Sequence, residues 1–346
     1  MPKIAKGLIL PSAAFVLKSK SIKQYERRDK MPEVGDVVYG AICRLGQHRS
    51  LENVSGRIHE THVGMRALFV YGNRYAPDYY EGLLPENNLN EVDLLARSGV
   101  IGLVKTQNAL IAAPTRVRVL GYAIDEAGQV INTRNHSLVR PQHAEKKHPR
   151  SRLILVVGTA MNSGKSLAAS AAVWALNTMG YSVRGSKVTG TASLKDILHM
   201  NDAGADPYND FTYFGYPSTY LLPEADVLRI FNELDLRYAN NARNYWVVEL
   251  ADGIVQRETA LLLASNDVKD RIHRLIFCAN DAFGAIGGLR VLQERYGLEP
   301  DALSGLCSSS PLHIRELAEF TDIPVFNSAN PDLNELAHLL VGEVAR

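Results

Sequence analysis

One stretch, residues 153–166, restricts the fold of this chain more than any other part of it. It reads Leu-Ile-Leu-Val-Val-Gly-Thr-Ala-Met-Asn-Ser-Gly-Lys-Ser, and an alanine-rich segment follows it. An apolar run, a loop of small residues and a helix-forming segment, in this order, are typical of a turn that binds phosphate. Loop N–H groups and the positive end of the helix hold the anion in such turns.

The spacing of this loop differs from that of the common P-loop. Five residues separate Gly158 from Gly164, where the common motif has four. Lys165 is expected to reach the β- and γ-phosphates, and the Ser166 hydroxyl to ligate Mg²⁺. An ordinary glycine-containing turn with a surface lysine is the alternative, and the order of the elements disfavours it. The residues expected to bind the phosphates are Gly158, Thr159, Asn162, Ser163, Gly164, Lys165 and Ser166.

Length and composition indicate a globular chain of two domains. The chain has 346 residues, of which 46% are hydrophobic and 22% charged. No apolar run approaches the roughly 20 residues that span a bilayer, so we expect no membrane segment. The three cysteines, Cys43, Cys278 and Cys307, are odd in number and far apart, which favours the reducing cytoplasm over a disulfide framework.

Charge divides the chain unevenly. Residues 1–150 contain 22 Lys and Arg against 14 Asp and Glu, and the remainder contains 16 against 23. The two halves therefore differ in their partners or attract each other. A nucleic acid held by the basic half is an open alternative that we do not favour.

The two halves also differ in hydrophobic pattern. Short glycine-punctuated runs in the first half predict strands at 34–45, 54–58, 65–71, 99–104 and 117–122, with a helix at 91–97. Such a pattern is typical of a small barrel or an antiparallel sheet. The polar stretch 140–152, with its two prolines, marks a boundary. We predict a β-rich domain at 1–140, a linker at 141–151 and a P-loop domain at 152–346.

In the second half, strand-like and helix-like runs alternate. This alternation predicts an α/β fold with a doubly wound parallel sheet and helices on both faces. The expected strands are 153–157, 182–188, 245–250, 274–278, 303–307 and 324–326. The expected helices are 165–179, 224–239, 257–266, 287–296, 314–320 and 333–344.

Polar residues at the carboxyl ends of these strands are the candidate site, because ligands bind there in parallel sheets. Lys187 would neutralise phosphate or an anionic substrate, although a surface lysine is the alternative. Glu249 follows apolar residues on a central strand, where an unpaired carboxylate is costly. We favour Mg²⁺ ligation or water positioning for Glu249, with a structural ion pair as the alternative. The Asn280 amide is placed to read a nucleobase or to orient substrate.

A long polar segment, residues 191–220, lies between the second and third of these strands. Asp196 and Asp202 are both candidates for a further Mg²⁺ ligand, and we prefer Asp202. A solvated loop is the alternative, although long irregular segments are often functional. His59 and His62 lie three residues apart, and we interpret them as surface residues because no third metal ligand is near in sequence.

Together these motifs resemble a known group of enzymes. The Gly-Thr-x4-Gly-Lys-Ser loop resembles that of dethiobiotin synthetase and its P-loop relatives. Lys187 with Thr189-Gly190 resembles that family's Lys-Pro-x-x-Thr-Gly strand end. Glu249-Leu-Ala-Asp-Gly253 resembles its Glu-Gly-x-Gly stretch. The chain is also similar to D-glutamate N-acetyltransferase-like proteins, which join an N-terminal domain to a deviant P-loop domain. The resemblance covers at most residues 152–330.

The resemblance implies a ligase or synthetase that binds Mg²⁺ and ATP and phosphorylates a small carboxylate-type molecule. Lys165, Lys187 and Glu249 would then be catalytic, and Ser166 and Glu249 would hold the metal, with Asp202 as the further ligand that we prefer from its place in the chain. Two alternatives remain open, a coenzyme A-dependent N-acyltransferase and a nucleotide-dependent accessory or nucleic-acid-binding protein. We expect a small-molecule substrate, no membrane partner, a homo-oligomer and a cytoplasmic location.

Overall fold

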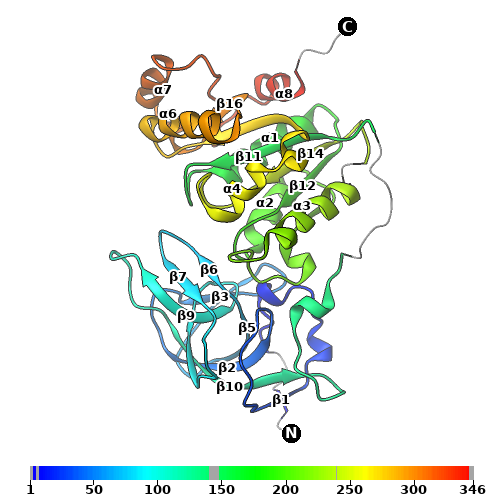
Figure 1. Ribbon diagram of the computed structural model, residues 1–346, viewed down its shortest axis with the longest axis vertical. Helices are drawn as coiled ribbons and strands as arrows, with labels where there is room; N and C mark the ends of the chain where they lie inside the picture. The colour runs from blue at the N-terminus through cyan, green and yellow to red at the C-terminus, as the bar shows by residue number, and fades with distance from the viewer. Residues whose placement is uncertain (1–2, 5–7, 140–147, 239, 343–346) are drawn as a thin grey trace. The chain divides into compact units, whose positions relative to one another are not determined.

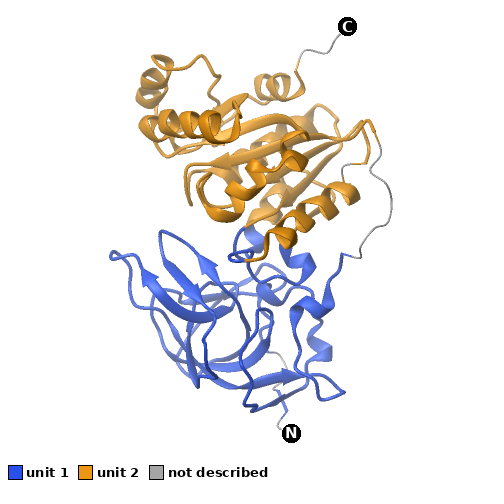
Figure 2. Ribbon diagram, in the orientation of Figure 1, with its two compact units in different colours: residues 1–140, 190–195, 211–221 blue, residues 141–189, 196–210, 222–346 orange. Residues whose placement is uncertain are grey.

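The computed structural model describes residues 3–4, 8–139, 148–238 and 240–342 (Figure 1). The chain forms two compact units, shown in different colours in Figure 2. The barrel unit comprises residues 1–140, 190–195 and 211–221, and the P-loop unit comprises the rest. Residues 190–195 and 211–221 thus belong with the N-terminal half, although they lie inside the range expected for the P-loop domain. Most of the expected linker, residues 141–147, lies outside the described residues.

The P-loop unit is built on one sheet of six parallel strands in the order β13-β12-β14-β11-β15-β16. This confirms the α/β fold with a parallel sheet. The first strand in sequence, β11, lies between β14 and β15, and the chain passes to opposite sides of it. Such a position favours ligand binding beyond its carboxyl end. The strands are β11 (Arg152–Gly158), β12 (Val183–Lys187), β13 (Tyr208–Asp210), β14 (Tyr245–Glu249), β15 (Ile272–Cys278) and β16 (Ala302–Ser304).

Helices flank this sheet (Figure 1). The alanines of α1 lie in one buried cluster with Ile154 and Val156 of the sheet and Leu336 and Leu340 of α8. Small side chains allow α1 to pack closely on both neighbours, which explains its composition. The helices are α1 (Lys165–Thr178), α2 (Leu194–Asp202), α3 (Glu224–Tyr238), α4 (Arg257–Ala264), α5 (Asn266–Lys269), α6 (Ala282–Val291), α7 (Pro311–Ala318) and α8 (Leu333–Val341).

Several sequence expectations need correction here. The strand expected at 303–307 ends at Ser304, because Gly305 turns the chain with a φ of 94°. The stretch 324–326 contributes a single bridge from Val325 to Leu303 and forms no strand. Helix α2 and strand β13 lie in the segment that the sequence pattern left without elements.

In the barrel unit, five strands close into a ring. Strand β10 pairs with β2, β2 with β5, β5 with β9, β9 with β8, and β8 again with β10. Strand β1 adds to β10, while β7 and β6 extend from β9. The barrel alternative of the sequence analysis therefore holds. The ring strands are β2 (Val37–Arg44), β5 (Arg66–Tyr71), β8 (Glu91–Leu94), β9 (Val100–Gln107) and β10 (Arg116–Ile124). The others are β1 (Gln24–Glu26), β3 (Ser50–Glu52), β4 (Ile58–Glu60), β6 (Arg74–Tyr75) and β7 (Tyr80–Leu83).

Two apolar cores form because neighbouring residues of a strand face opposite sides of the barrel wall. Phe69 and Val117 belong to the inner core, and Leu68 and Val70 to the outer one. Residues 10–22 supply apolar side chains that cover the outer face. The helix expected at 91–97 is wrong, because residues 91–94 form β8.

Residues 190–195 and 211–221 are built into the barrel unit by specific contacts. The Thr133 hydroxyl donates to the Gly215 carbonyl at 2.6 Å. The Tyr220 hydroxyl donates to Glu81 Oε1 at 2.9 Å, and the Ala192 side chain is part of the outer core. Among the residues that the structure describes, no helix combines the length and hydropathy that crossing a membrane requires.

Candidate phosphate-binding site

The predicted loop joins the end of β11 to the start of α1. Strand β11 ends at Gly158 and α1 begins at Lys165, so the loop comprises residues 159–164. Asn162 and Gly164 have left-handed φ angles of 61° and 95°. Left-handed residues within a short loop turn successive N–H groups toward a common point, which is how an anion-binding nest forms. The backbone therefore has the form that the sequence predicts for phosphate binding.

Lys165 lies within this loop and is nearly buried, with 5% of its surface exposed. Its Nζ donates to the Ala160 carbonyl at 2.7 Å and lies 3.4 Å from Ser163 Oγ. Burial lowers the pKa of Lys165, an effect that Glu249 partly offsets. The ammonium group thus contacts neutral oxygens of its own loop, and phosphate oxygens would be stronger partners for it.

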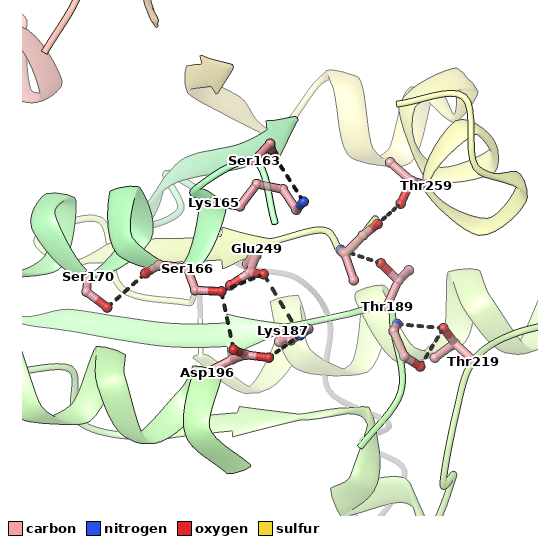
Figure 3. A network of polar contacts seen from close by, with 12 residues as sticks. Ser163, Lys165, Ser166, Ser170, Lys187, Thr189, Asp196, Thr219, Glu249 and Thr259 are labelled. Atoms are coloured by element: carbon pink, nitrogen blue, oxygen red, sulfur yellow. Dashed lines mark hydrogen bonds and ion pairs between the residues drawn. The ribbon is translucent and has the colours of Figure 1, made fainter. Parts of the chain in front are cut away.

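Four further side chains gather beside the first turn of α1 (Figure 3). The Ser166 hydroxyl lies 3.2 Å from Glu249 Oε1 and 3.3 Å from Asp196 Oδ1. Lys187 Nζ pairs with Asp196 Oδ2 and lies 3.9 Å from Glu249 Oε1. The structure therefore brings the predicted Lys165, Ser166, Lys187 and Glu249 together at one edge of the sheet.

Strand register explains this convergence. Lys187 of β12 is aligned with Glu249 of β14, which is aligned with Val156 near the end of β11. Parallel strands in this register deliver their last side chains to the edge where the phosphate loop begins. Asp196 reaches the same place from the first turn of α2.

Burial and charge oppose each other in this cluster. Burial raises the pKa of Glu249, and the neighbouring Lys187 and Lys165 counteract this effect. Burial alone would lower the pKa of Lys187, but Asp196 and Glu249 outweigh it and the pKa is raised. Lys187 therefore stays protonated as the central cation of the group.

The residues present fit a magnesium ion. Glu249 Oε2 is buried and accepts no hydrogen bond from the described residues. This oxygen, Asp196 Oδ1 and the Ser166 hydroxyl are hard oxygen ligands, and Mg²⁺ commonly takes one or two carboxylates while keeping several waters. No group of three or more His, Cys, Asp or Glu residues placed to hold a metal occurs within the described ranges. A metal held by protein and phosphate together suits this donor set better than an all-protein cage.

The structure does not bring Asp202 to this cluster. Asp202 is the exposed last residue of α2, six residues after Asp196 and hence about 9 Å farther along the helix. Asp196 therefore takes the place that the sequence analysis gave to Asp202. Leu194, Ile197 and Leu198 follow the spacing of a helix face, and this signal would have placed Asp196 in a first helical turn.

Asn280 is exposed and lies two residues after Cys278, the last residue of β15. The following residue, Asp281, caps α6, since its Oδ1 accepts from the Gly284 N–H at 2.7 Å. The phosphate loop is joined to this strand end, because the Thr159 N–H donates to the Cys278 carbonyl at 2.9 Å. Phe283, with 85% of its surface exposed, lies in the first turn of α6 and was not singled out from the sequence.

Comparisons with known proteins add little to this geometry. No family model matches the chain, and no curated protein matches it. A solved structure that it is similar to is the signal recognition particle receptor FtsY from Elizabethkingia anophelis in complex with GDP. The identity is 11%, the TM-score is 0.39, and the match covers 61% of this chain and 70% of that chain. The sheet order, the loop and the strand-end residues themselves give the C-terminal unit a P-loop NTPase-like fold.

Proposed function

We propose that this protein is a Mg²⁺- and ATP-dependent ligase or synthetase that phosphorylates a small carboxylate-type molecule. The observation that carries the proposal is the cluster of Lys165, Ser166, Lys187, Asp196 and Glu249 beside the phosphate loop. Two cations, two carboxylates and a hydroxyl match the needs of phosphoryl transfer, which depends on positioning and charge neutralisation.

Each side chain has a distinct task in this proposal. Lys165 exchanges the Ala160 carbonyl for phosphate oxygens. Ser166, Glu249 and Asp196 hold Mg²⁺, which supplies neutralising charge to the β- and γ-phosphates when it is bound. Lys187 lies beside the metal ligands and neutralises the incoming carboxylate or the transferred phosphoryl group. Asn280, two residues after β15, would contact the nucleobase, and the exposed ring of Phe283 would offer the base a stacking surface.

The carboxylate acceptor rests on the resemblance of Lys187-Val-Thr189-Gly190 to the dethiobiotin synthetase strand end. A carboxylate oxygen would attack the γ-phosphorus and form the new O–P bond. The bond from the γ-phosphorus to the leaving oxygen would break, and its electron pair would remain on ADP. No proton needs to move in this half of the reaction, because a carboxylate is already ionised at neutral pH.

The two carboxylates beside Ser166 favour this function over a coenzyme A-dependent acyltransferase. Phosphates of coenzyme A held without a metal would meet Asp196 and Glu249 as like charges. A nucleotide that arrives with Mg²⁺ converts the same two groups into ligands. The geometry therefore supports binding of a nucleotide together with Mg²⁺ over binding of coenzyme A without a metal.

The test of nucleotide binding is Lys165→Ala, followed by titration calorimetry with Mg·ATP. We expect affinity to fall about 100-fold, because a buried charge-assisted contact to phosphate is lost. Lys105→Ala, an exposed lysine of β9, is the matched control and should leave affinity unchanged. Equal Mg·ATP affinity in the Lys165 variant and the wild type would mean that the loop does not bind this nucleotide.

A second variant, Glu249→Gln, separates binding from turnover. Nucleotide binding should survive, while ATP consumption that depends on Mg²⁺ and a small carboxylate should fall. Unchanged consumption would remove Glu249 from the site. A thermal-shift comparison of ATP and coenzyme A, with and without Mg²⁺, identifies the ligand class, since a true ligand raises the apparent stability.

A further inference from the structure

Asp252, which has no role in the reaction described so far, lies in the turn that follows β14. Its φ is 60°, in the left-handed region that few residues other than glycine adopt, although Asp tolerates it better than most. A residue other than glycine in this conformation is strained, and such strain is concentrated at functional sites.

Two hydrogen bonds fix the backbone of Ala251, the residue before Asp252. The Ala251 N–H donates to Thr189 Oγ1 at 2.9 Å, and the Thr259 hydroxyl donates to the Ala251 carbonyl at 2.7 Å (Figure 3). All three groups are buried, so solvent does not compete for these bonds. The backbone that leads into Asp252 is therefore held in place.

The same turn packs directly on the phosphate loop. The Ile254 N–H donates to the Gly158 carbonyl at 2.9 Å. A Cβ atom at Gly253 would lie 2.2 Å from the Thr159 carbonyl oxygen, so only glycine allows this approach. Asp252 thus directly precedes a residue in van der Waals contact with the loop that binds phosphate.

Charge places the Asp252 carboxylate near both lysines of the site. Burial lowers the pKa of Lys165, and the negative charge of Asp252 offsets part of this effect. The same charge adds to the raised pKa of Lys187. The other acids that act on these lysines are Glu249 of β14, which acts on both, and Asp196 of α2, which acts on Lys187. Asp196 and Glu249 are the carboxylates beside Ser166, where the metal fits, and Asp252 is a further acid whose charge acts on the same lysines.

We propose that Asp252 faces the terminal phosphate position and accepts the proton of the nucleophile that attacks the acyl phosphate, or of water that attacks the terminal phosphate itself. This inference rests on the proposed function and adds that the reaction uses a protic nucleophile, such as an amine, a hydroxyl or water. After phosphorylation of the carboxylate, the lone pair of this nucleophile forms a bond to the acyl carbon, and the bond from that carbon to the phosphate oxygen breaks. Inorganic phosphate leaves with that electron pair, and the proton of the nucleophile moves to the Asp252 carboxylate, which later releases it to solvent.

Water serves as the nucleophile in the test, because hydrolysis of ATP can be measured without identifying the substrate. Its oxygen lone pair forms the bond to the γ-phosphorus as the O–H bond breaks and the proton moves to the Asp252 carboxylate. The bond from phosphorus to the leaving oxygen breaks, and that electron pair stays on ADP. The proton is then lost to solvent, which restores the carboxylate.

The experiment compares Asp252→Asn and Asp252→Gly with the wild type. Both replacements suit a left-handed φ, so neither threatens the fold. We expect Mg·ATP hydrolysis by water to fall about 100-fold or more, as for a lost general base. Binding of Mg·ATP should tighten about 5-fold, because a like charge near the terminal phosphate is removed, while ADP binding changes little. Asp270→Asn, an exposed acid at the end of α5, should change neither quantity.

The outcomes separate this inference from the function beneath it. Wild-type protein that binds no Mg·ATP, or binds it as well without Lys165, overturns the proposed function. Wild-type protein that binds Mg·ATP but does not hydrolyse it overturns the proton-acceptor role of Asp252. Hydrolysis at the wild-type rate, or unchanged Mg·ATP affinity, in the Asp252 variants also overturns it.

Discussion

Two buried lysines in the P-loop unit differ in their partners, since one is paired with carboxylates and the other contacts only neutral oxygens. Lys187 is paired with Asp196 and lies near Glu249, and its pKa is raised. Lys165 contacts a carbonyl and a hydroxyl, and burial lowers its pKa. Lys187 therefore stabilises the protein itself, whereas Lys165 is costly to bury until an anion arrives.

We predict that Lys187→Met destabilises the ligand-free protein, while Lys165→Met does not. Removing Lys187 leaves two carboxylates without their cation, which should lower the free energy of unfolding by about 3 kcal/mol. Removing Lys165 relieves a desolvated charge, so the free energy of unfolding should change by less than about 1 kcal/mol or rise. Urea unfolding of both variants at neutral pH measures the difference. Equal losses would show that the two lysines are not electrostatically distinct.

His48 makes the barrel unit sensitive to acid. Its Nε2 lies 2.8 Å from Arg74 Nη1, and since a guanidinium only donates, this nitrogen must be unprotonated. Burial, with a smaller contribution from Arg74, lowers the pKa of His48 to about 3. The folded form thus binds its proton less readily than the unfolded form, whose pKa is about 6.5.

We predict that wild-type stability declines as the pH falls from 6.5 toward 3, by about 1 kcal/mol per pH unit from this group. Above pH 6.5 both states are neutral at His48 and the contribution is complete. His48→Gln keeps an acceptor for Arg74 and does not titrate, so its stability should fall less steeply over this interval. Parallel stability curves for the two proteins would exclude His48 as the source.

At the scale of elements, Gly305, which lies between β16 and the short 3₁₀ helix Leu306–Ser309, packs against the phosphate loop. A Cβ atom at Gly305 would lie 2.3 Å from the Ser163 carbonyl oxygen, and the residue has a φ of 94°. The Cys307 N–H also donates to the Ala279 carbonyl at 3.0 Å, which ties this turn to the end of β15. Residues far apart in sequence thus set the shape of the loop.

We predict that Gly305→Ala weakens Mg·ATP binding and lowers the free energy of unfolding by about 2 kcal/mol. The added methyl group must displace Ser163 and with it the loop. Gly287→Ala is the control, because a Cβ atom there meets nothing within 4 Å and the residue is helical. That variant should gain roughly 0.5–1 kcal/mol. Calorimetry and thermal unfolding of both variants give the comparison, and normal nucleotide affinity in the Gly305 variant would contradict the supporting role.

How well the sequence predicts an element depends on whether its pattern is local. The apolar runs at β11, β14 and β15 and the loop itself were predicted, because a buried parallel strand leaves an unbroken apolar signature. Strand β8 was taken for a helix, since Leu94, Leu95 and Ala96 favour helix. Yet Asp93 pairs with Arg116 at 2.8 Å while Val92 and Leu94 enter the inner core, a period of two.

The residues of the candidate site differ in the same way, since some follow from local pattern and one depends on contacts between distant residues. Lys187 and Glu249 end their strands, and Lys165 and Ser166 begin the helix after β11. The convergence of these four residues could therefore be predicted from the order of elements. Asp252 was missed because its position depends on a left-handed turn and on contacts with Thr189 and Thr259. Contacts of this kind join residues that are distant in sequence, and no local periodicity predicts them.

At the scale of the whole molecule, the unit boundaries do not coincide with a single cut in the chain. Residues 190–195 and 211–221 leave the ends of β12 and β13 and belong to the barrel unit. Phe15 packs against Tyr213 with ring centroids 4.8 Å apart, and Tyr75 against Tyr220 at 5.5 Å. The barrel unit therefore needs residues from the second half of the sequence.

We predict that a chain of residues 148–342 does not fold into a stable P-loop unit. Ala192 and Phe214 would lose the burial that they have in the full chain, which exposes apolar surface. Expression yield and thermal unfolding, compared with the full chain, measure this effect. A second truncated chain, with residues 211–221 replaced by a short Gly-Ser linker, should recover part of the yield. A soluble and cooperative 148–342 fragment would contradict the prediction.

The two returning segments also set an order of events during translation. The closed ring of β2, β5, β8, β9 and β10 is complete by residue 124, yet residue 221 must leave the ribosome before every part of the barrel unit exists. By then the first three strands of the parallel sheet, β11 to β13, have been synthesised as well. Completion of the N-terminal unit thus waits until the nascent chain also contains Lys165, Ser166, Lys187 and Asp196 of the candidate site.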